Sequence, residues 1–237
     1  SEMRNLFMIT VVIKELVMVG SFAFGEGQQE PAKKDVITVG FSQIGAESAW
    51  RVANTESIRG EAEKRPNINL LFSDAQQKQE NQIKALRNFI AQGVDVIAFS
   101  PVVESGWEPV LREAKAAGIP VILSDRAVDV EDDSLWVTFM GSDFVEEGVR
   151  AAKWLIEKLA GKGANVVELV GTVGSAPAND RASGFRDGIK NNPEIKITKS
   201  QSGDFTRAKG KEVMEAFLKA EGKNIDVLYA HNDDMAL

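Results

Sequence analysis

The chain of 237 residues contains no cysteine and a single histidine, His231. The lack of cysteine excludes disulfides, thiolate zinc sites, iron–sulfur ligation and thiol nucleophiles. A Ser-His-Asp triad or a histidine metal site would have to be built around His231 alone. Most hydrolytic chemistry is therefore disfavoured before any motif is considered.

Basic residues are in deficit, because 28 Lys and Arg face 35 Asp and Glu, for a formal net charge of −7. Such a chain has no basic field to attract nucleic acid or anionic lipid, so we predict no nucleic-acid partner. The glycine-containing string GTVGSA (171–176) matches neither the dinucleotide fingerprint nor the phosphate loop. We expect no catalytic residue, no metal site and no cofactor, and a nucleotide-dependent enzyme is the least favoured class.

The first 35 residues differ in composition from the rest of the chain. A short positive region precedes two apolar runs, 6–13 and 16–24, which Lys14 and Glu15 separate and which end among small residues. Neither run reaches the roughly 18 residues needed to span a membrane. The pattern predicts a secretory signal peptide over 1–25 and a polar linker over 26–35, with an amphipathic helix or a retained membrane anchor as the alternative.

From residue 36 onward, short β-branched runs alternate with segments of helical length and spacing. The predicted strands are 36–42, 67–74, 94–101, 119–126, 134–143, 165–171, 195–202 and 224–231. The predicted helices are 48–65, 79–92, 107–117, 144–159, 179–191 and 206–221. This order predicts an α/β protein with two doubly wound parallel-sheet lobes, 36–140 and 141–237, joined by a hinge.

Ligands of doubly wound sheets bind beyond the carboxyl ends of the strands, so polar residues at these ends are the informative ones. They are Ser42, Gln43, Asp74, Ser100, Asp125, Arg126, Asp143, Gly171, Thr172, Gln201, Ser202, Asn232 and Asp233. Carboxylates, amides and guanidinium groups suit a neutral polyol or sugar, since each sugar hydroxyl both donates and accepts. Trp50 and Phe205 are candidates to cover the C–H face of a sugar ring.

Several polar and aromatic residues also have a purely structural alternative. Ser42, Asp74, Ser100 and Asp143 are each more typical of helix caps. Trp107 is expected to pack in the core. For Arg181 the alternatives are an ion pair with Asp180 or coverage of its own helix by the side-chain stem. His231 is expected to be a hydrogen-bonded residue at the end of a strand.

Several strings of this sequence are similar to those of a known family. They are GFSQIGAESAWR (40–51), DAQQKQENQIKALRNFIAQGVDVI (74–97), SPVVESGWEPVLREAK (100–115), ILSDR (122–126), VVELVGTVGSAPANDRASGF (166–185), SQSGDFTRAKGKEVMEAF (200–217) and YAHNDDMAL (229–237). Together they resemble type I periplasmic sugar-binding proteins, the solute-binding proteins of ABC transporters. Galactofuranose-binding members are most similar and ribose-binding members follow.

The resemblance implies a monomeric, two-lobed periplasmic protein that closes on one monosaccharide and presents it to a membrane ABC permease. It assigns ligand binding to Ser42, Glu47, Trp50, Arg51, Asp125, Arg126, Arg181, Phe205 and Asn232. Arg51 favours a galactofuranose-like over a ribose-like ligand, because many ribose binders lack a basic residue there.

One departure from the family concerns the end of the sequence. The family continues past the N-D-D-M helix with an aspartate on a later strand and with segments that return to the first lobe, so we expect a C-terminally incomplete chain.

A sugar-sensing effector or chemoreceptor-ligand domain of the same fold is the alternative function. A repressor of this kind would carry an N-terminal helix-turn-helix, where this chain has an apolar segment.

Overall fold

The structure is a computed structural model and describes residues 36–237. The predicted signal peptide (1–25) and linker (26–35) lie outside the described residues. Among residues 36–237, no helix combines the length and the apolar character that crossing a membrane requires.

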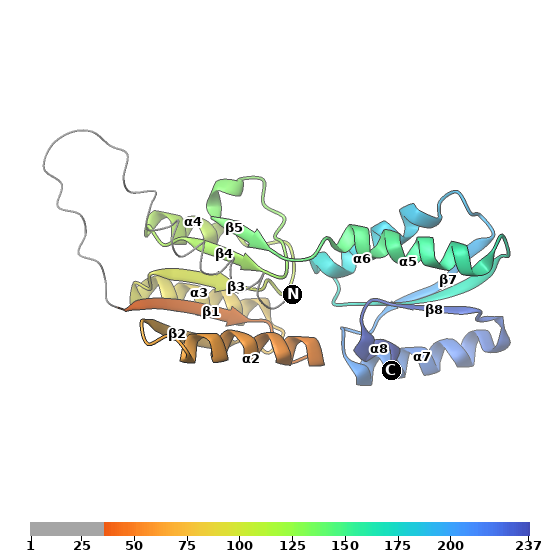
Figure 1. Cartoon of the computed structure of the whole chain (residues 1–237), viewed down its shortest axis with the longest axis horizontal. Helices are drawn as coiled ribbons and strands as arrows, with labels where there is room; N and C mark the ends of the chain where they lie inside the picture. Colours follow the sequence, from red (N-terminus) through yellow and green to blue (C-terminus); the bar gives the residue numbers. More distant parts are fainter. Residues whose placement is uncertain (1–35) are drawn as a thin grey trace, which may run out of the picture. The chain divides into compact units, whose positions relative to one another are not determined.

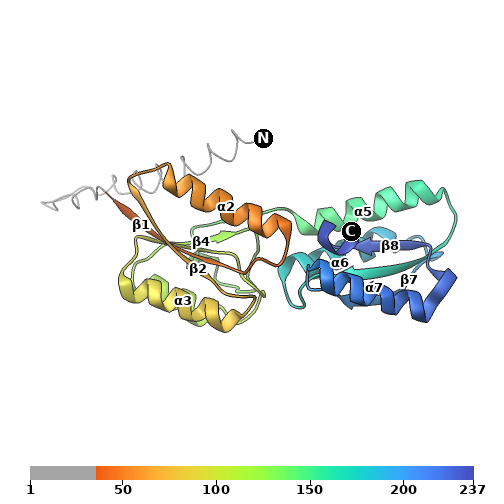
Figure 2. The ribbon, with the colours of Figure 1, turned by 90° about the horizontal axis from the view of Figure 1, so that it is seen from below.

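The first half of the described chain forms a sheet of five parallel strands in the order β2-β1-β3-β4-β5. The strands are β1 (Ile37–Gln43), β2 (Ile68–Asp74), β3 (Val96–Phe99), β4 (Val121–Ser124) and β5 (Thr138–Met140). The connecting helices are α2 (Ala49–Glu63), α3 (Gln79–Gln92) and α4 (Glu108–Ala116). Helices α2 and α3 lie on opposite faces of this sheet (Figure 2).

One face of this sheet carries the main hydrophobic core. Leu86 and Phe89 of α3 and Leu111 of α4 pack with Ile97, Phe99 and Leu123 of the strands. Trp107 is fully buried in the same core, its ring centroid 4.9 Å from that of Phe99, as expected from the sequence. Helices α3 and α4 thus pack against β3 and β4, and the polar residues Ser100 and Asp125 directly follow these two strands.

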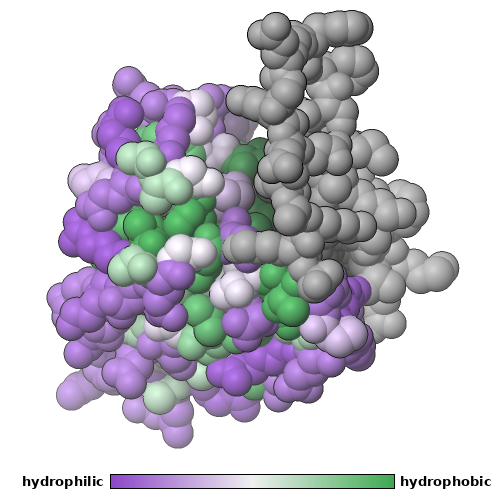
Figure 3. Space-filling model, turned by 90° about the vertical axis from the view of Figure 1, so that its left-hand side faces the viewer, coloured by the Kyte–Doolittle hydropathy of each residue, from purple (hydrophilic) through white to green (hydrophobic). Residues whose placement is uncertain are grey.

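The face under α2 is covered less completely. Arg51 is the one buried residue of α2, whereas Ile68, Leu70 and Phe72 of β2 are only partly buried. These three side chains and Arg59 of α2 line a shallow pocket of about 240 Å³. In the view of Figure 3, hydrophobic residues are exposed between hydrophilic ones. Helix α2 therefore contributes little to the core and mainly positions polar groups at its N-terminus.

The second half forms a three-stranded parallel sheet in the order β7-β6-β8. Its strands are β6 (Ala164–Val170), β7 (Ile195–Ser202) and β8 (Val227–Ala230). Helices α5 (Phe144–Leu159) and α6 (Ala176–Ile189) pack on one face and α7 (Arg207–Glu221) on the other, and the short α8 (Asp233–Ala236) follows β8 (Figure 1, Figure 2). The chain passes from β5 to α5 through residues 141–143.

The predicted fold class, α/β with two doubly wound parallel sheets, is confirmed. Several predicted bounds are wrong. The strand predicted over 134–143 is reduced to β5, because Asp133–Leu135 form a 3-10 turn that Asp132 caps. The strand predicted over 224–231 begins at Val227, since a second 3-10 turn occupies Gly222–Asn224. Helix α6 begins at Ala176 instead of 179, because Pro177 suits the first turn of a helix.

Candidate functional site

Four charged side chains meet at the carboxyl ends of β1 and β4, and we call them the Arg51–Arg126 cluster: Glu47, Arg51, Asp125 and Arg126. The Arg51 guanidinium donates from Nε to Glu47 Oε1 at 3.0 Å and from Nη2 to Asp125 Oδ2 at 2.6 Å. Arg126 lies beside both carboxylates, with Nη2 3.8 Å from Glu47 Oε1 and Nε 3.9 Å from Asp125 Oδ2. Two cations and two anions therefore form one balanced network.

Local structure places these groups precisely. The Ser48 hydroxyl caps α2 by accepting the Arg51 N–H at 3.2 Å, so Glu47 and Arg51 stand one turn apart at the start of the helix. Asp125 follows β4 with φ +68°, a left-handed conformation that costs free energy for a residue other than glycine. This turn brings Asp125 and Arg126, adjacent in sequence, to the same network.

The cluster is almost completely withdrawn from solvent. The side chains of Glu47, Arg51 and Arg126 are 2%, 3% and 2% exposed, and that of Asp125 is 14% exposed. Burial lowers the pKa of Arg126 to about 10, and the charge of Arg51 acts in the same direction, whereas Asp125 and Glu47 oppose the shift. Arg126 thus remains protonated at neutral pH. Removing such charges from water is costly, so the network is weak evidence for stability and better evidence for a function.

Three buried polar atoms have no hydrogen-bond partner among the described residues: Glu47 Oε2 and Arg126 Nε of this network, and Ser42 Oγ near the end of β1. One is an acceptor, one is a donor and one is a hydroxyl that does both. An unpaired buried polar group costs roughly 1–3 kcal/mol, so groups of this kind call for an explanation. Together they match the donors and acceptors of a polyol.

Phe205 and Arg181 extend the site from the second sheet. The guanidinium carbon of Arg126 lies 5.3 Å from the centroid of the Phe205 ring, and that of Arg181 lies 5.9 Å from it. Phe205 is 4% exposed and has φ +60°, again a left-handed conformation at a bulky residue. Arg181 pairs with Glu147 at 2.8 Å and not with its neighbour Asp180, which corrects the ion pair considered from the sequence.

The other three predicted residues are connected to the same set less directly. Ser42 is fully buried at the end of β1. Trp50 is 56% exposed, and the Arg51 guanidinium carbon lies 4.8 Å from its ring centroid. Asn232 caps α8 by accepting the Met235 N–H at 3.1 Å, and it donates to the Phe205 carbonyl at 3.0 Å. The Asn232 amide thus joins the start of α8 to the backbone of Phe205.

Two residues that contact Arg51 are not among the nine predicted binding residues. The Ser100 hydroxyl and the Asn54 side-chain oxygen each lie 3.5 Å from Arg51 Nη1. Asn54 stands three residues after Arg51, on the same face of α2, and this helical spacing was the signal that could have found it. Ser100 was noted as a strand-end residue, but its alternative as a cap was the more typical role.

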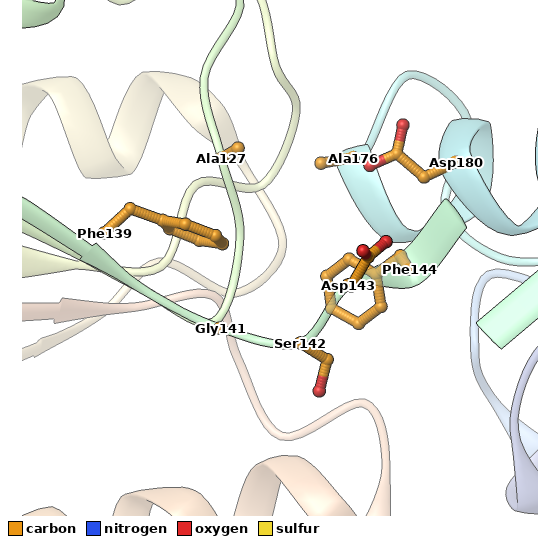
Figure 4. Close-up of a pocket in the computed structure, with 8 residues that line it drawn as sticks. All are labelled: Ala127, Phe139, Gly141, Ser142, Asp143, Phe144, Ala176 and Asp180. Atoms are coloured by element: carbon orange, nitrogen blue, oxygen red, sulfur yellow. The ribbon is translucent and has the colours of Figure 1, made fainter. Parts of the chain in front are cut away.

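A separate pocket of about 370 Å³ lies around residues 141–144, which connect the two sheets. Figure 4 shows Phe139 and the carboxylates of Asp143 and Asp180 among its lining residues. Asp143 caps α5 by accepting the Glu146 N–H at 2.9 Å, so the capping alternative is confirmed for this residue. Burial, and then the charge of Asp143, raises the pKa of Asp180. None of the nine predicted binding residues lines this pocket.

No group of three or more histidine, aspartate or glutamate side chains among residues 36–237 is arranged to hold a metal ion. The chemistry of the site is that of hydrogen bonding by charged groups beside an aromatic ring.

Comparisons with known proteins show the family to which the chain belongs. Residues 39–237 match the model of the periplasmic binding protein domain. The galactofuranose-binding protein YtfQ of Escherichia coli (strain K12) is 60% identical over 203 residues, which are 85% of this chain and 64% of that protein. The ribose import binding protein RbsB of Bacillus subtilis (strain 168) is 34% identical over 204 residues, which are 86% of this chain and 64% of that protein.

Among solved structures, the periplasmic binding protein component of the arabinose ABC transporter from Shewanella sp. ANA-3, bound to alpha and beta-L-arabinofuranose, superposes with a TM-score of 0.81. It is 57% identical, and the match covers 84% of this chain and 66% of that one. The chain therefore spans less than two thirds of the length of the two relatives named above.

Proposed function

Because the chain belongs to the periplasmic binding protein domain family, we propose that it is the substrate-binding component of a sugar ABC transporter. Its ligand is a monosaccharide, galactofuranose-like or ribose-like, held at the Arg51–Arg126 cluster. The observation that carries the proposal is that two buried atoms of this cluster, Glu47 Oε2 and Arg126 Nε, have no hydrogen-bond partner among the described residues.

The chemistry of a sugar matches these atoms. A hydroxyl can donate to Glu47 Oε2 while a neighbouring hydroxyl accepts from Arg126 Nε, and both bonds are strengthened because a charged group takes part. The ring of Phe205, 4% exposed and close to Arg126, offers an apolar surface for the C–H face of the ligand. An epimer of the sugar, with one hydroxyl in the opposite configuration, would leave one buried charged group unpaired. This loss is the physical basis of selectivity.

A galactofuranose-like ligand is favoured over a ribose-like one by two observations. The relatives with 60% and 57% identity are named for galactofuranose and arabinose, the latter bound as a furanose. Arg51, whose presence pointed to a galactofuranose-like ligand, is buried at the centre of the network and bridges Glu47 and Asp125. We therefore place the galactofuranose-like ligand before the ribose-like one.

The proposal includes the setting in which the protein works. We propose two lobes, 36–140 and 141–237, that close on the sugar, and a membrane ABC permease that receives the closed form. The protein is proposed to act in the periplasm after export by an N-terminal signal, as a monomer without nucleic acid and without catalysing a reaction. Membership of a periplasmic binding family supports this setting.

Isothermal titration calorimetry with two isomeric glycosides tests the ligand. Methyl β-D-galactofuranoside and methyl β-D-galactopyranoside contain the same atoms and differ in ring size. We expect saturable binding of the furanoside and binding at least about tenfold weaker for the pyranoside. Saturable binding of ribose alone would move the ligand to the ribose-like class, and the lack of a saturable response to any sugar in a broad panel would reject the proposal.

A pair of arginine variants tests the site. Arg126→Lys keeps the charge but removes Nε and the planar fork, so sugar affinity should fall at least about tenfold. Arg112→Lys is the matched control, because Arg112 is 55% exposed on α4 and pairs with Glu108 there. Equal affinities of the two variants would show that Arg126 does not contact the sugar.

A further inference from the structure

A second buried polar network lies inside the second sheet, and the sugar site does not include it. Glu168 of β6 has a side chain that is 0% exposed and carries a charge. Its two oxygens accept from Arg186 Nη1 at 3.0 Å and Nη2 at 2.6 Å, and Oε2 also accepts from the Ser200 hydroxyl at 2.6 Å. The remaining contact of Oε1 is His231 Nε2 at 3.2 Å. Four donors thus converge on one carboxylate.

These contacts determine the tautomer of the only histidine in the chain. Hydrogen bonds from His231, Arg186 and Ser200 outweigh the effect of burial and lower the pKa of Glu168 to about 2, so Glu168 is ionised and only accepts. His231 must then carry its proton on Nε2. The other ring nitrogen, Nδ1, is left free to accept the backbone N–H of Gly171 at 3.4 Å. The carboxylate therefore orients the imidazole towards Gly171.

Gly171 lies directly beneath the Phe205 ring. A Cβ atom built on Gly171 would come within 1.9 Å of Phe205 Cζ, so the ring rests on the backbone where any side chain would be. The Gly171 carbonyl accepts from the Ser202 hydroxyl at 2.6 Å, and Asn232, the residue after His231, donates to the Phe205 carbonyl at 3.0 Å. Two consecutive residues thus contact the surroundings of the ring: His231 binds the backbone of Gly171 beneath it, and Asn232 binds the backbone of Phe205 itself.

We propose that His231 is a positioning residue of the sugar site: as a neutral imidazole protonated on Nε2, it holds the Gly171 backbone through Nδ1 and so fixes the position of the Phe205 ring. The inference rests on the proposed function, in which this ring covers the sugar. His231 itself does not touch the sugar.

Protonation of His231 removes this support. An imidazolium has no free lone pair on Nδ1, so it repels the Gly171 N–H instead of accepting it. The charged groups that face the imidazole of His231 are Glu168 on β6 and Arg181 and Arg186 on α6. The ring of Tyr229 on β8 lies beside the imidazole, with 5.0 Å between the two ring centroids. Burial lowers the pKa of His231 below its ordinary 6.5, against the effect of Glu168, so the neutral form prevails at pH 7. Sugar affinity should therefore be constant around neutral pH and fall in acid.

Nuclear magnetic resonance of the wild-type protein tests the geometry without sugar. Because His231 is the only histidine, its imidazole ¹⁵N signals need no assignment by mutation. We expect the Nε2-protonated tautomer at pH 7, a contact between the Phe205 ring and the Gly171 α-protons, and a Gly171 amide shift that titrates together with the ring. An Nδ1-protonated tautomer, or a Gly171 amide chemical shift that does not change as His231 titrates, would overturn the proposal.

Two substitutions test the effect on binding. His231→Gln offers a donor and an acceptor at nearly the spacing of the two ring nitrogens and does not titrate, whereas His231→Leu offers neither. We expect His231→Gln to stay within about threefold of wild-type affinity and to lose the decline in acid, and His231→Leu to bind at least about tenfold more weakly at pH 7. Equal affinities of the two variants would overturn the proposal.

The NMR and binding experiments distinguish a failure of the proposed function from a failure of the proposed role of His231. A wild-type protein that binds no sugar would reject the proposed function, and the tautomer and the Phe205–Gly171 contact would still decide whether His231 positions the ring. Circular dichroism and thermal unfolding of each variant establish that both are folded before affinities are compared.

Discussion

Glu168 allows the most quantitative prediction, because its side chain is fully buried and its four hydrogen-bond donors are known. The perturbation is Glu168→Gln, which keeps the shape of the side chain but removes its charge. The amide NH₂ of the variant would face donors of Arg186, Ser200 or His231, and the Arg186 guanidinium would lose its counter-charge. We expect both effects to destabilise the fold at neutral pH.

The pKa of Glu168 gives the magnitude. It falls from an ordinary 4.5 to about 2 in the folded protein. At about 1.4 kcal/mol for each unit, the ionised carboxylate contributes about 3 kcal/mol to the free energy of unfolding. Since the folded pKa is the lower one, this contribution is complete above about pH 5 and disappears as the pH falls towards 2.

Urea unfolding followed by circular dichroism at a series of pH values measures this contribution. Glu168→Gln should be about 3 kcal/mol less stable than wild type at pH 7, and the difference should shrink steadily below pH 5. Glu157→Gln, a change at an exposed glutamate of α5, is the matched control and should follow the wild type within about 0.5 kcal/mol. A difference between wild type and Glu168→Gln that stays constant from pH 7 to pH 2 would refute the reasoning.

Two further predictions concern the ring of Phe205 and the first core. Gly171→Ala places a methyl group 1.9 Å from the Phe205 ring, so the ring must move by more than about 1 Å to reach normal contact; sugar affinity measured by calorimetry should fall about tenfold. Gly60→Ala, where an added Cβ meets nothing within 4 Å, should leave affinity unchanged, and equal affinities of the two variants would disprove the role of Gly171. Leu86→Ala removes a side chain that is 1% exposed in the core of the first sheet and should lower the free energy of unfolding by about 2–5 kcal/mol. Leu218→Ala, at a position that is 50% exposed on α7, should cost far less in the same denaturation experiment.

The sequence alone was sufficient for the order of strands and helices in the described region. Periodicity of apolar residues is a local property, so the bounds of helix α3, Gln79–Gln92, were predicted correctly. The helix ends at Gly93, whose φ of +63° suits glycine. Predicted bounds were wrong where a second local preference competed with periodicity. Because Pro177 suits the first turn of a helix, α6 begins three residues before its predicted start, and the 3-10 turn at Asp133–Leu135 makes β5 shorter than predicted.

The candidate site, too, was predictable from the sequence only in part. The carboxyl ends of parallel strands share one edge of a sheet, so Ser42, Asp125 and Arg126 could be grouped from strand order alone. Family resemblance added Glu47 and Arg51. What the sequence could not give was which of these atoms already have partners, because hydrogen bonds between residues 74 positions apart, such as Arg51 to Asp125, depend on how the strands are packed.

Tertiary structure alone decides which hydrogen bonds Asn232 and His231 make within the chain. Both stand in one short string after β8, and sequence reasoning assigned the asparagine to the ligand and the histidine to a hydrogen bond at a strand end. In the fold, the amide of Asn232 is used by Met235 and Phe205, while His231 lies between Glu168 and Gly171, 63 and 60 residues earlier in the chain. A residue's type and position fix the bonds it is able to make, and only the packing of distant strands determines which of those bonds are formed.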